Sequence, residues 1–418
     1  MQTKLDEAKA ELLARTARVA ENSPGGQQPG QGLDEEAVQA FLQQYYLHTA
    51  PEDLLDRDPV DVYGAALSHY RLAETRPQGT ANVRVHTPTV EENGWTCSHT
   101  VVEVVTDDMP FLVDSVTTEL SRQDRAIHVV IHPQVVVRRD VTGKLLEILD
   151  YAAPSSAVGP ELPHDGIVES WIHVEIDRET DRNDLKQITT DLRRVLSDVR
   201  EAVEDWTKMR DAALRLADEL AAAPPPLPEQ EVGEAWELLR WLADDHFTFL
   251  GYREYELTTE SGADGTEDVL AAVPGTGLGV LRSDPTHRDM EGTHCVSNTF
   301  HRLPPGVRSK ARERKLLVLT KANSRATVHR PAYLDYVGVK TFDADGNVTG
   351  ERRFLGLFSS AAYTESVTRV PVIRRKVQEV LSGAGFLPDS HDGRDLLQIL
   401  ETYPRDELFQ TSADELRP

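Results

Sequence analysis

Four side chains that commonly bind metals lie within a short stretch of this sequence. They are His287, His294, Cys295 and His301. A structural zinc site usually combines a C-x2-C pair with an H-x3–5-H pair, and neither spacing occurs in this stretch. We therefore predict that these side chains are solvated or packed, and that the chain has no metal site.

Three further histidines, His128, His132 and His173, fall on segments with the pattern of strands. Because side chains alternate between the two faces of a strand, some of these rings should point into a core. Histidines in such positions are more often core or surface residues than catalytic ones. We predict a structural role for all three.

A glycine-rich run, PGTGLG at residues 274–279, raises the question of dinucleotide binding. In a dinucleotide site a helix opens inside the run, so that the pyrophosphate meets the helix N-terminus. Here an extended and then turned segment follows, Val280 to Pro285. The run therefore predicts a plain turn between strands, with no cofactor bound by this part of the chain.

Motifs that carry an activated nucleophile are missing from the sequence. It contains no G-x-S-x-G elbow, no S-x-x-K and no G-x4-G-K-[ST] phosphate loop. Adjacent carboxylates such as Asp244 and Asp245 are common in an acidic protein and are usually solvated. We predict that the chain by itself has no catalytic residues.

The most informative polar residues form an acidic turn between a predicted strand and a predicted helix. Alternating β-branched residues run from Thr100 to Thr106, and helical spacing of apolar residues follows the turn. Backbone amides at a helix N-terminus can hold a carboxylate. The candidate effector-binding residues are Asp107, Asp108, Met109, Pro110, Phe111, Asp114 and Ser115. The alternative is that Asp108 only caps the helix while Phe111 and Leu112 fill the core.

A basic group stands out against the acidic background of the chain. Its candidate interface residues are Arg308, Lys310, Arg312 and Arg314. One interpretation is a solvated segment that leads into a strand. The other is a contact with an acidic surface of another subunit or domain.

Bulk composition excludes several classes of protein. The chain has 418 residues, of which 39% are hydrophobic and 28% charged, which is typical of globular proteins with two or three domains. A net charge of -25 repels phosphate backbones, so we expect no nucleic-acid partner. Two distant cysteines, Cys97 and Cys295, give no disulfide framework. Without a segment of about 20 apolar residues or a secretory signal, the sequence predicts no membrane partner and a cytoplasmic location.

The first half of the chain alternates predicted helices and strands. We expect helices at residues 1–20, from Leu33 with Asp34 as its N-cap, at Pro59 to Arg71 behind Asp58, and at Asp184 to Leu220. We expect strands at Ala81–His86, Thr100–Thr106, Ile127–Val137, Leu145–Leu149 and Glu169–Ile176. Three consecutive prolines at residues 224–226, with a fourth at Pro228, end the long helix and form a stiff spacer.

After this spacer the pattern predicts a helix and an antiparallel sheet of the PAS-like or GAF-like kind. The expected helices are Gly233–Asp245, Pro371–Leu381 and Gly393–Glu401. The expected strands are Phe247–Leu257, Lys315–Thr320, Arg325–Arg330, Tyr333–Phe342 and Arg352–Ser359, the last two joined by a turn at residues 343–347. Two FLG strings, at residues 249–251 and 354–356, are predicted to lie on paired core strands.

Several strings of the sequence strongly resemble one family. They are VEVVTDDMPFLVDSV, IHVVIHPQVVVRRD, ESWIHVEIDRETD, DDHFTFLGYREYEL, GVLRSD and FLPDSHDGRDLLQILETYPRDELFQ. From about Gln39 onward the chain resembles the N-terminal ACT-like and PAS-like region of the large bacterial NAD-dependent glutamate dehydrogenases, of the actinobacterial type. The resemblance implies an α+β, multidomain chain in which an ACT-like (ferredoxin-like) domain precedes a PAS-like antiparallel-sheet domain.

The resemblance also implies a function. The parent enzyme oxidises L-glutamate with NAD to 2-oxoglutarate, ammonium and NADH, and this chain would be its regulatory and oligomerisation segment without the catalytic domain. Its partners would be other domains and subunits of a homo-oligomer, with an amino acid as a possible effector. NAD would belong to the parent enzyme, with no cofactor in this segment. The alternative is a free-standing ACT/PAS-type sensor or protein-interaction module.

The domain limits expected from these patterns divide the chain into five parts. They are an N-terminal helix and spacer (1–32), an ACT-like domain with flanking helices (33–222), a proline-rich linker (223–232), a PAS-like domain (233–390) and the start of a further domain (391–418). One departure from the ACT pattern is evident, because βαββαβ order expects a last strand where the long helix instead runs into the linker.

Overall fold

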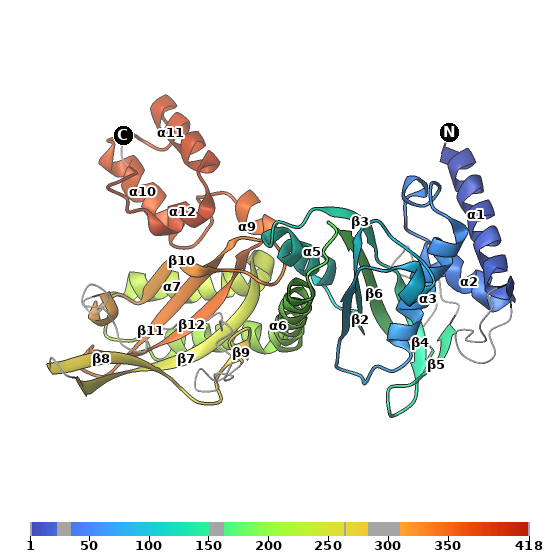
Figure 1. Ribbon diagram of the computed structural model, residues 1–418. Helices are drawn as coiled ribbons and strands as arrows, with labels where there is room; N and C mark the ends of the chain where they lie inside the picture. Colours follow the sequence, from blue (N-terminus) through green and yellow to red (C-terminus); the bar gives the residue numbers. More distant parts are fainter. Residues whose placement is uncertain (1, 23–34, 150–162, 263–264, 283–309, 417–418) are drawn as a thin grey trace. The chain divides into compact units, whose positions relative to one another are not determined.

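A computed structural model describes residues 2–22, 35–149, 163–262, 265–282 and 310–416. The chain divides into two compact units, Met1–Ser197 (unit 1) and Asp198–Pro418 (unit 2). Each unit contains one antiparallel sheet together with helices (Figure 1), so the α+β class predicted from the sequence is confirmed. The finer domain limits expected from the sequence stay predictions.

Unit 1 is built from six strands and a set of helices on both sides of them. Its strands are β1 (Asn82–His86), β2 (Thr100–Asp107), β3 (Ile127–Ile131), β4 (Gln134–Arg139), β5 (Leu145–Leu149) and β6 (Ile167–Ile176). Its helical elements are α1 (Gln2–Asn22), α2 (Glu35–Tyr45), η1 (Pro51–Asp53), α3 (Pro59–Ala73), α4 (Val90–Asn93), α5 (Leu112–Arg122) and the first part of α6 (Arg182–Ala222).

The sheet of unit 1 has the strand order β1-β2-β6-β4-β5, and β3 also pairs with β6. Strand β6 is central, because β2 runs along one of its edges and β3 and β4 share the other. The register sets Glu103 opposite His173 and Asp107 opposite Glu169. Buried polar residues of two strands are therefore direct neighbours.

The single strand predicted over Ile127–Val137 is wrong in one respect, since it is two strands. β3 pairs with residues 173–176 of β6, and β4 pairs with residues 167–170. The break falls at Pro133, which has no N–H to donate to the ladder. The carbonyl of Pro133 still accepts a hydrogen bond from the Trp171 amide at 3.1 Å, so both pieces stay on the same edge.

The helices α2 and α3 cover one face of this sheet, and α1 packs on these two helices (Figure 1). Helix α3 begins as predicted, because the side chain of Asp58 accepts a hydrogen bond from the Val60 amide and Pro59 is the first helical residue. The indole of Trp171 on β6 packs edge-on against Phe41 and Tyr70, with ring centres 6.0 and 6.4 Å apart. Burial of such aromatic groups stabilises the packing on this face.

Helix α5 lies against β3 and β6 on the other face of the sheet, beside the first turns of α6 (Figure 1). Polar contacts join the two helices. The side-chain amide of Gln123 donates to Asp191 at 3.1 Å, and the buried carboxylate of Glu119 lies 3.7 Å from the guanidinium of Arg194. Because both faces are covered, the central strands are buried along most of their length.

Unit 2 contains the rest of α6 and a second sheet. Its strands are β7 (Phe247–Gly262), β8 (Gly265–Ala272), β9 (Leu278–Gly279), β10 (Leu317–Arg325), β11 (Tyr333–Phe342) and β12 (Val348–Phe358). Its other helical elements are α7 (Glu229–Trp241), η2 (Leu242–His246), α9 (Ser360–Thr364), α10 (Ile373–Gly383), α11 (His391–Thr402) and α12 (Arg405–Gln410).

The second sheet has the order β10-β11-β12-β7-β8, and the short β9 pairs with β7. The prediction that the two FLG strings lie on paired strands is confirmed, since Leu355 is opposite Gly251 and Gly356 is opposite Phe249. The predicted hairpin turn is also present. The carboxylate of Asp343 accepts hydrogen bonds from the amides of Asp345 and Asn347 and closes it.

Two further expectations for this unit can be compared with the structure. The strand predicted over Arg325–Arg330 is wrong. The segment after Arg325 is a bend closed by an Ala326 to Ala332 amide–carbonyl bond, with His329 in the left-handed region (φ 73°). The glycine-rich run is a turn that leads into β9, as predicted, and no helix opens inside it.

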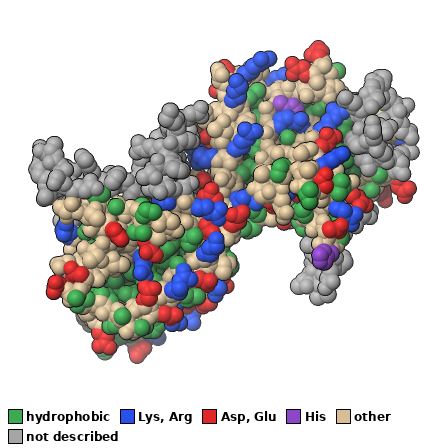
Figure 2. Space-filling view, turned by 90° about the horizontal axis from the view of Figure 1, so that it is seen from below, with side chains coloured by type: hydrophobic (Ala, Val, Ile, Leu, Met, Phe, Trp, Pro, Cys, Tyr) green, Lys and Arg blue, Asp and Glu red, His purple; other side chains and the backbone are tan. Residues whose placement is uncertain are grey.

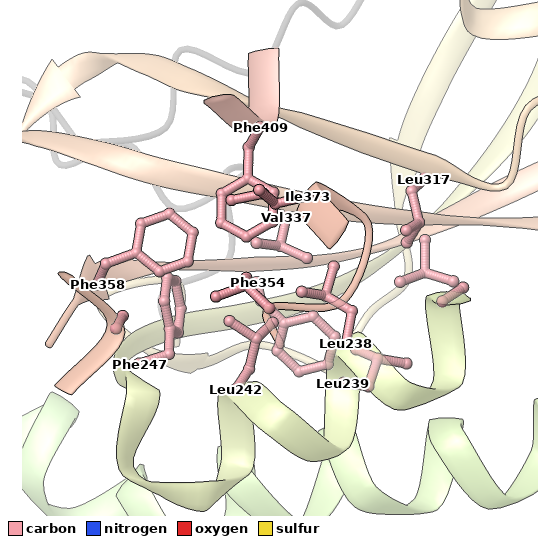
Figure 3. Packing of buried hydrophobic residues seen from close by; sticks show 14 of the residues in the cluster. Leu238, Leu239, Leu242, Phe247, Leu317, Val337, Phe354, Phe358, Ile373 and Phe409 are labelled. Carbon is pink, nitrogen blue, oxygen red and sulfur yellow. The ribbon is translucent and has the colours of Figure 1, made fainter. Parts of the chain in front are cut away.

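The core of unit 2 lies between its sheet and helices α7, α10 and α12. Figure 3 shows Leu238, Leu239 and Leu242 from the helix side meeting Phe247 and other aromatic side chains from the strands. Phe358 on β12 stacks on Phe409 of α12 with ring centres 5.1 Å apart. The last helices are therefore part of the hydrophobic core of this unit.

The surface and the helices carry two more findings. On the face shown in Figure 2, Lys and Arg side chains lie among Asp and Glu side chains, even though the net charge is -25. Within the described residues, no helix combines the length and the apolar character that crossing a bilayer requires.

Two helical glycines give a matched test of the packing. A Cβ added at Gly64 would lie 2.3 Å from Trp95, whereas a Cβ at Gly233 meets nothing closer than 4.0 Å. We predict that Gly64→Ala lowers the free energy of unfolding by about 1–3 kcal/mol through overpacking. Gly233→Ala should raise it by up to about 1 kcal/mol, because alanine favours helix. Urea unfolding of both variants checks this, and a stabilised Gly64→Ala variant would contradict the packing described.

Candidate functional site

The most unusual chemical feature of unit 1 is a row of polar side chains inside the protein. Residues at alternate positions of β6 share one face, which places Glu169, Trp171, His173 and Glu175 toward α2 and α3. Glu103 on β2 is the direct neighbour of His173 in this row. The four polar members are almost completely buried, so each must have partners of opposite charge or hydrogen-bond partners.

Glu169 is the centre of the first cluster in the row. Its carboxylate accepts hydrogen bonds from the guanidinium of Arg76 at 2.6 and 3.0 Å, and from that of Arg139 at 2.6 and 2.9 Å. The indole N–H of Trp171 donates to the same carboxylate at 3.0 Å. Both guanidiniums are buried, and Asp107 supplies a second negative charge at 2.7 Å from Arg76. Two positive and two negative charges thus balance inside the unit.

This cluster fixes the start of the acidic turn predicted from the sequence. One carboxylate oxygen of Asp107 accepts from Arg76, and the other accepts from the amide of Gly79 at 3.0 Å. Arg76 also donates to the carbonyl of Thr80 at 2.9 Å. The end of β2 is therefore tied to the loop that precedes β1.

Asp108 has a different set of partners from Asp107. It accepts hydrogen bonds from the hydroxyl of Ser170 at 2.5 Å and from the side-chain amide of Gln134 at 2.9 Å. The imidazole of His132 is 2.9 Å from the same hydroxyl, and burial lowers the pKa of His132. The alternative that Asp108 caps helix α5 is wrong, because the N-cap residue is Phe111 and no side chain caps this helix.

The remaining predicted effector residues surround the start of α5. Phe111 has φ 71°, a left-handed conformation that a bulky side chain rarely adopts. Met109 and Phe111 are half-buried, Pro110 and Asp114 are exposed, and Ser115 is fully buried with its amide bonded to the Phe111 carbonyl at 2.9 Å. The structure therefore brings these residues into one turn but directs Asp107, Asp108 and Ser115 into separate contacts.

The second cluster of the row surrounds Glu103 and His69. Arg84 donates to Glu103 at 2.6 Å, and His86 lies 3.5 Å from it. Burial alone would raise the pKa of Glu103, but the neighbouring His86, His69 and Arg84 hold that pKa well below its usual range.

His69 is neutral in this environment. Its Nε2 donates to the Val104 carbonyl at 3.0 Å, and its Nδ1 accepts from the Tyr45 hydroxyl at 2.8 Å, because a carbonyl oxygen can only accept. Burial, together with the nearby His173, lowers the pKa of His69 to about 4, although Glu103 opposes the shift.

The third cluster forms where β6 ends. Arg57 binds both oxygens of Glu175, at 2.5 and 3.0 Å, and His99 Nδ1 lies 3.0 Å from Glu175 Oε2. Burial would raise the pKa of Glu175, but hydrogen bonds from His173 and Arg57 lower it. Burial and the charge of Glu175 raise the pKa of the Cys97 thiol to about 11, so this thiol is not an activated nucleophile.

The predicted interface residues lie just before β10. Arg312 makes a two-fold contact with Asp268 of β8, at 2.5 and 2.7 Å, and also donates to Thr259. Arg314 donates to the Pro226 carbonyl at 3.4 Å, and the Lys310 carbonyl accepts from Lys340. Arg308 lies outside the described residues, as do the four potential metal ligands at residues 287–301.

Sequence reasoning missed the residues at the centre of the row. Glu103, Glu169 and Glu175 were included only as parts of strands, although charged residues at alternating positions of an apolar strand are a signal of buried partners. Of the three strand histidines, His173 is buried, His132 half-buried and His128 exposed, so alternation does aim some rings inward as predicted. The arrangement of these groups is suited to holding the turn after β2 in position.

Two family models match the chain. The "Glutamate dehydrogenase, ACT1 domain" model matches residues 41–192, and the "Glutamate dehydrogenase, helical motif 1" model matches residues 370–418. The first match contains the whole sheet of unit 1 and the second contains α10, α11 and α12. The chain is thus α+β, and its residues 41–192 are similar to an ACT1 domain of the glutamate dehydrogenase type.

Three relatives of the chain are each described as an NAD-specific glutamate dehydrogenase. The protein of Halomonas elongata is 39% identical over 381 residues and that of Pseudomonas aeruginosa 38% over 380, in both cases 91% of this chain and 22% of the relative. The protein of Mycobacterium tuberculosis is 34% identical over 84% of this chain and 19% of its own length. The chain resembles the N-terminal ACT1 and helical-motif region of large NAD-specific glutamate dehydrogenases, and it spans about a fifth of their length.

The charge balance around Glu169 leads to a stability prediction. Glu169→Gln removes the negative charge that two buried guanidiniums share, so we expect it to lower the free energy of unfolding by about 3–5 kcal/mol. The control is Glu147→Gln, because Glu147 is 54% exposed and pairs with Arg138 at the surface. Exposed pairs contribute about 0–1 kcal/mol. Similar urea midpoints for both variants would contradict the assigned role of Glu169.

A pH prediction follows from His69. Its pKa is about 4 in the folded chain against an ordinary value of 6.5, so between these values the unfolded state binds more protons. The stabilising contribution is complete above pH 6.5 and is lost as the pH falls toward 4, by about 2 kcal/mol between pH 7 and pH 5. We compare urea unfolding of the natural chain with His69→Gln, which keeps a donor for the Val104 carbonyl. Parallel pH profiles of the two proteins would contradict this.

Proposed function

We propose that this chain is the regulatory and oligomerisation segment of a large NAD-dependent glutamate dehydrogenase. The identity of 38–39% to two NAD-specific glutamate dehydrogenases over 91% of the chain is the observation that carries the proposal. In this proposal the oxidation of L-glutamate with NAD to 2-oxoglutarate, ammonium and NADH belongs to parts of such an enzyme that this chain does not represent. The lack of nucleophile and dinucleotide-binding motifs in the sequence agrees with that division.

The two units would have different tasks in such an enzyme. We assign the binding of a small effector to the ACT1 domain in unit 1, and contacts with other subunits to the PAS-like sheet of unit 2. The exposed side chains of Lys310, Arg312 and Arg314 support an interface role for the edge before β10. Arg312 is 52% exposed even while it binds Asp268, so its guanidinium can meet a partner without losing its position.

The effector would be an amino acid bound at the turn from Asp107 to Ser115. The N-terminus of α5 suits a carboxylate, because the helix dipole favours negative charge there. The exposed carboxylate of Asp114 suits an ammonium group, and the half-buried carboxylate of Asp108 lies nearby in the chain. Ser115 is buried, so it would support the turn from beneath.

Coupling to catalysis requires that the effector favours one arrangement of the assembly. The hydrogen bonds of the turn provide a route for the first step. Asp107 links the turn to Arg76 and Glu169, and Asp108 links it to Ser170 and Gln134. A ligand that shifts the turn therefore shifts both central strands.

The experiment that tests this function has two parts. The purified chain is mixed with L-glutamate and NAD, and we expect no NADH above background. It is then heated with each natural amino acid in turn, and we expect at least one to raise the melting temperature, because a ligand of the folded state stabilises it. Turnover by this chain alone, or the absence of any thermal shift, would overturn the corresponding part of the proposal.

Calorimetry with variants locates the effector once a thermal shift has been found. Asp108→Asn and Asp114→Asn keep the shapes of the side chains, and we expect each to weaken binding about tenfold or more through the lost charge. The matched control is Asp345→Asn, an exposed aspartate in the β11–β12 turn of unit 2, which should bind the amino acid normally. Unchanged affinity in the first two variants would exclude this turn.

A further inference from the structure

Three residues of different chemistry meet at the end of β6. The register places Thr100, the first residue of β2, opposite Ile176, so the loop before β2 lies beside the last residues of β6. That loop carries Cys97 and His99 two positions apart, and β6 carries Glu175. The topology therefore brings a thiol, an imidazole and a carboxylate together within unit 1.

The donor atoms of these three side chains are close to one another. One sulfur, one nitrogen and one oxygen lie within 4.8 Å of each other. His99 Nδ1 is 3.0 Å from Glu175 Oε2, and the His99 amide is 3.4 Å from Cys97 Sγ. A tetrahedral zinc ion has bonds of about 2.0–2.3 Å, so its ligand atoms lie roughly 3.3–3.8 Å apart. Side-chain rotations that bring the three donors closer together would let them bind one ion.

The surroundings hold two of these ligands in place. Glu175 is buried and its Oε1 contacts Arg57 Nη1 at 2.5 Å and His173 at 3.4 Å. The ring of His99 stacks on that of His128 at 4.0 Å with an angle of 9°, and His128 Nε2 lies 2.8 Å from Asp177. Such outer contacts orient ligands in protein metal sites.

We propose that Cys97, His99 and Glu175 form a zinc-type divalent metal site. Sulfur, nitrogen and oxygen donors together suit Zn²⁺, whereas Mg²⁺ and Ca²⁺ prefer oxygen alone. When the metal binds, Glu175 Oε2 exchanges its contacts with Arg57 Nη2 and His99 for a bond to the metal. Glu175 Oε1 keeps its contact with Arg57 Nη1. The thiol of Cys97 binds as thiolate and its proton passes to solvent. His99 is 28% exposed, so a water molecule can complete the coordination.

The proposed site differs from the expectation of no metal site, which was drawn from histidine and cysteine spacing. The Cys-x-His pair at residues 97–99 does not indicate a metal site by itself, because the third ligand, Glu175, is 76 residues away from His99 in the sequence. The inference does not rest on the proposed function, since it concerns only contacts within unit 1. A metal bound at this site would hold the loop before β2 against the end of β6.

Cobalt(II) is the probe that tests the site. The full chain is freed of metal, kept reduced with a phosphine and titrated with Co²⁺, and we expect one equivalent to produce a thiolate-to-cobalt charge-transfer band. Cys97→Ser should abolish the band, and His99→Asn should weaken Co²⁺ binding at least tenfold. The control is Cys295→Ser, which changes the other cysteine of the chain and should keep the band.

Circular dichroism of the three variants checks that each is folded. Loss of the band with a normal spectrum in Cys97→Ser, together with its retention in Cys295→Ser, supports the site. No band with the natural chain, a band that survives in Cys97→Ser, or a band lost in Cys295→Ser would each overturn the proposal.

Discussion

One carboxylate, that of Glu169, determines how the sheet of unit 1 is held together. It is bound by two buried guanidiniums and an indole N–H, and these partners come from three different parts of the chain. Burying that many charges is costly unless every one is paired. The strands β2, β4 and β6 and the loop before β1 must therefore meet in a single register, since any shift would leave a charge without its partner.

The sequence was sufficient to predict most of the elements of the fold. Apolar periodicity located the long helix α6 and the central strands, and the capping signal at Asp58 with Pro59 located the start of α3. The errors are local. Pro133 divides a strand whose composition is continuous, and the segment after Arg325 bends although its composition favours a strand. In both places the backbone geometry of a few residues outweighs the pattern of side chains.

The candidate site was predicted less completely than the fold. The turn from Asp107 to Ser115 is where the sequence placed it, between a strand and a helix. What could not be predicted is which partners its carboxylates have, because Arg76 and Ser170 are far away in the sequence. The register of β2 against β6 decides those contacts, and register depends on pairings across the whole sheet. For the same reason Cys97 and Glu175 gave no sign of being neighbours.

The conformation of Phe111 has a consequence for how the start of α5 can move. Phe111 has a positive φ, which glycine adopts readily but an aromatic residue does not. A residue in this conformation holds roughly 1–3 kcal/mol of backbone strain, which the contacts around it must offset. The strained residue lies at the N-terminus of helix α5. A molecule that let this residue relax to an unstrained conformation would gain that free energy as binding affinity.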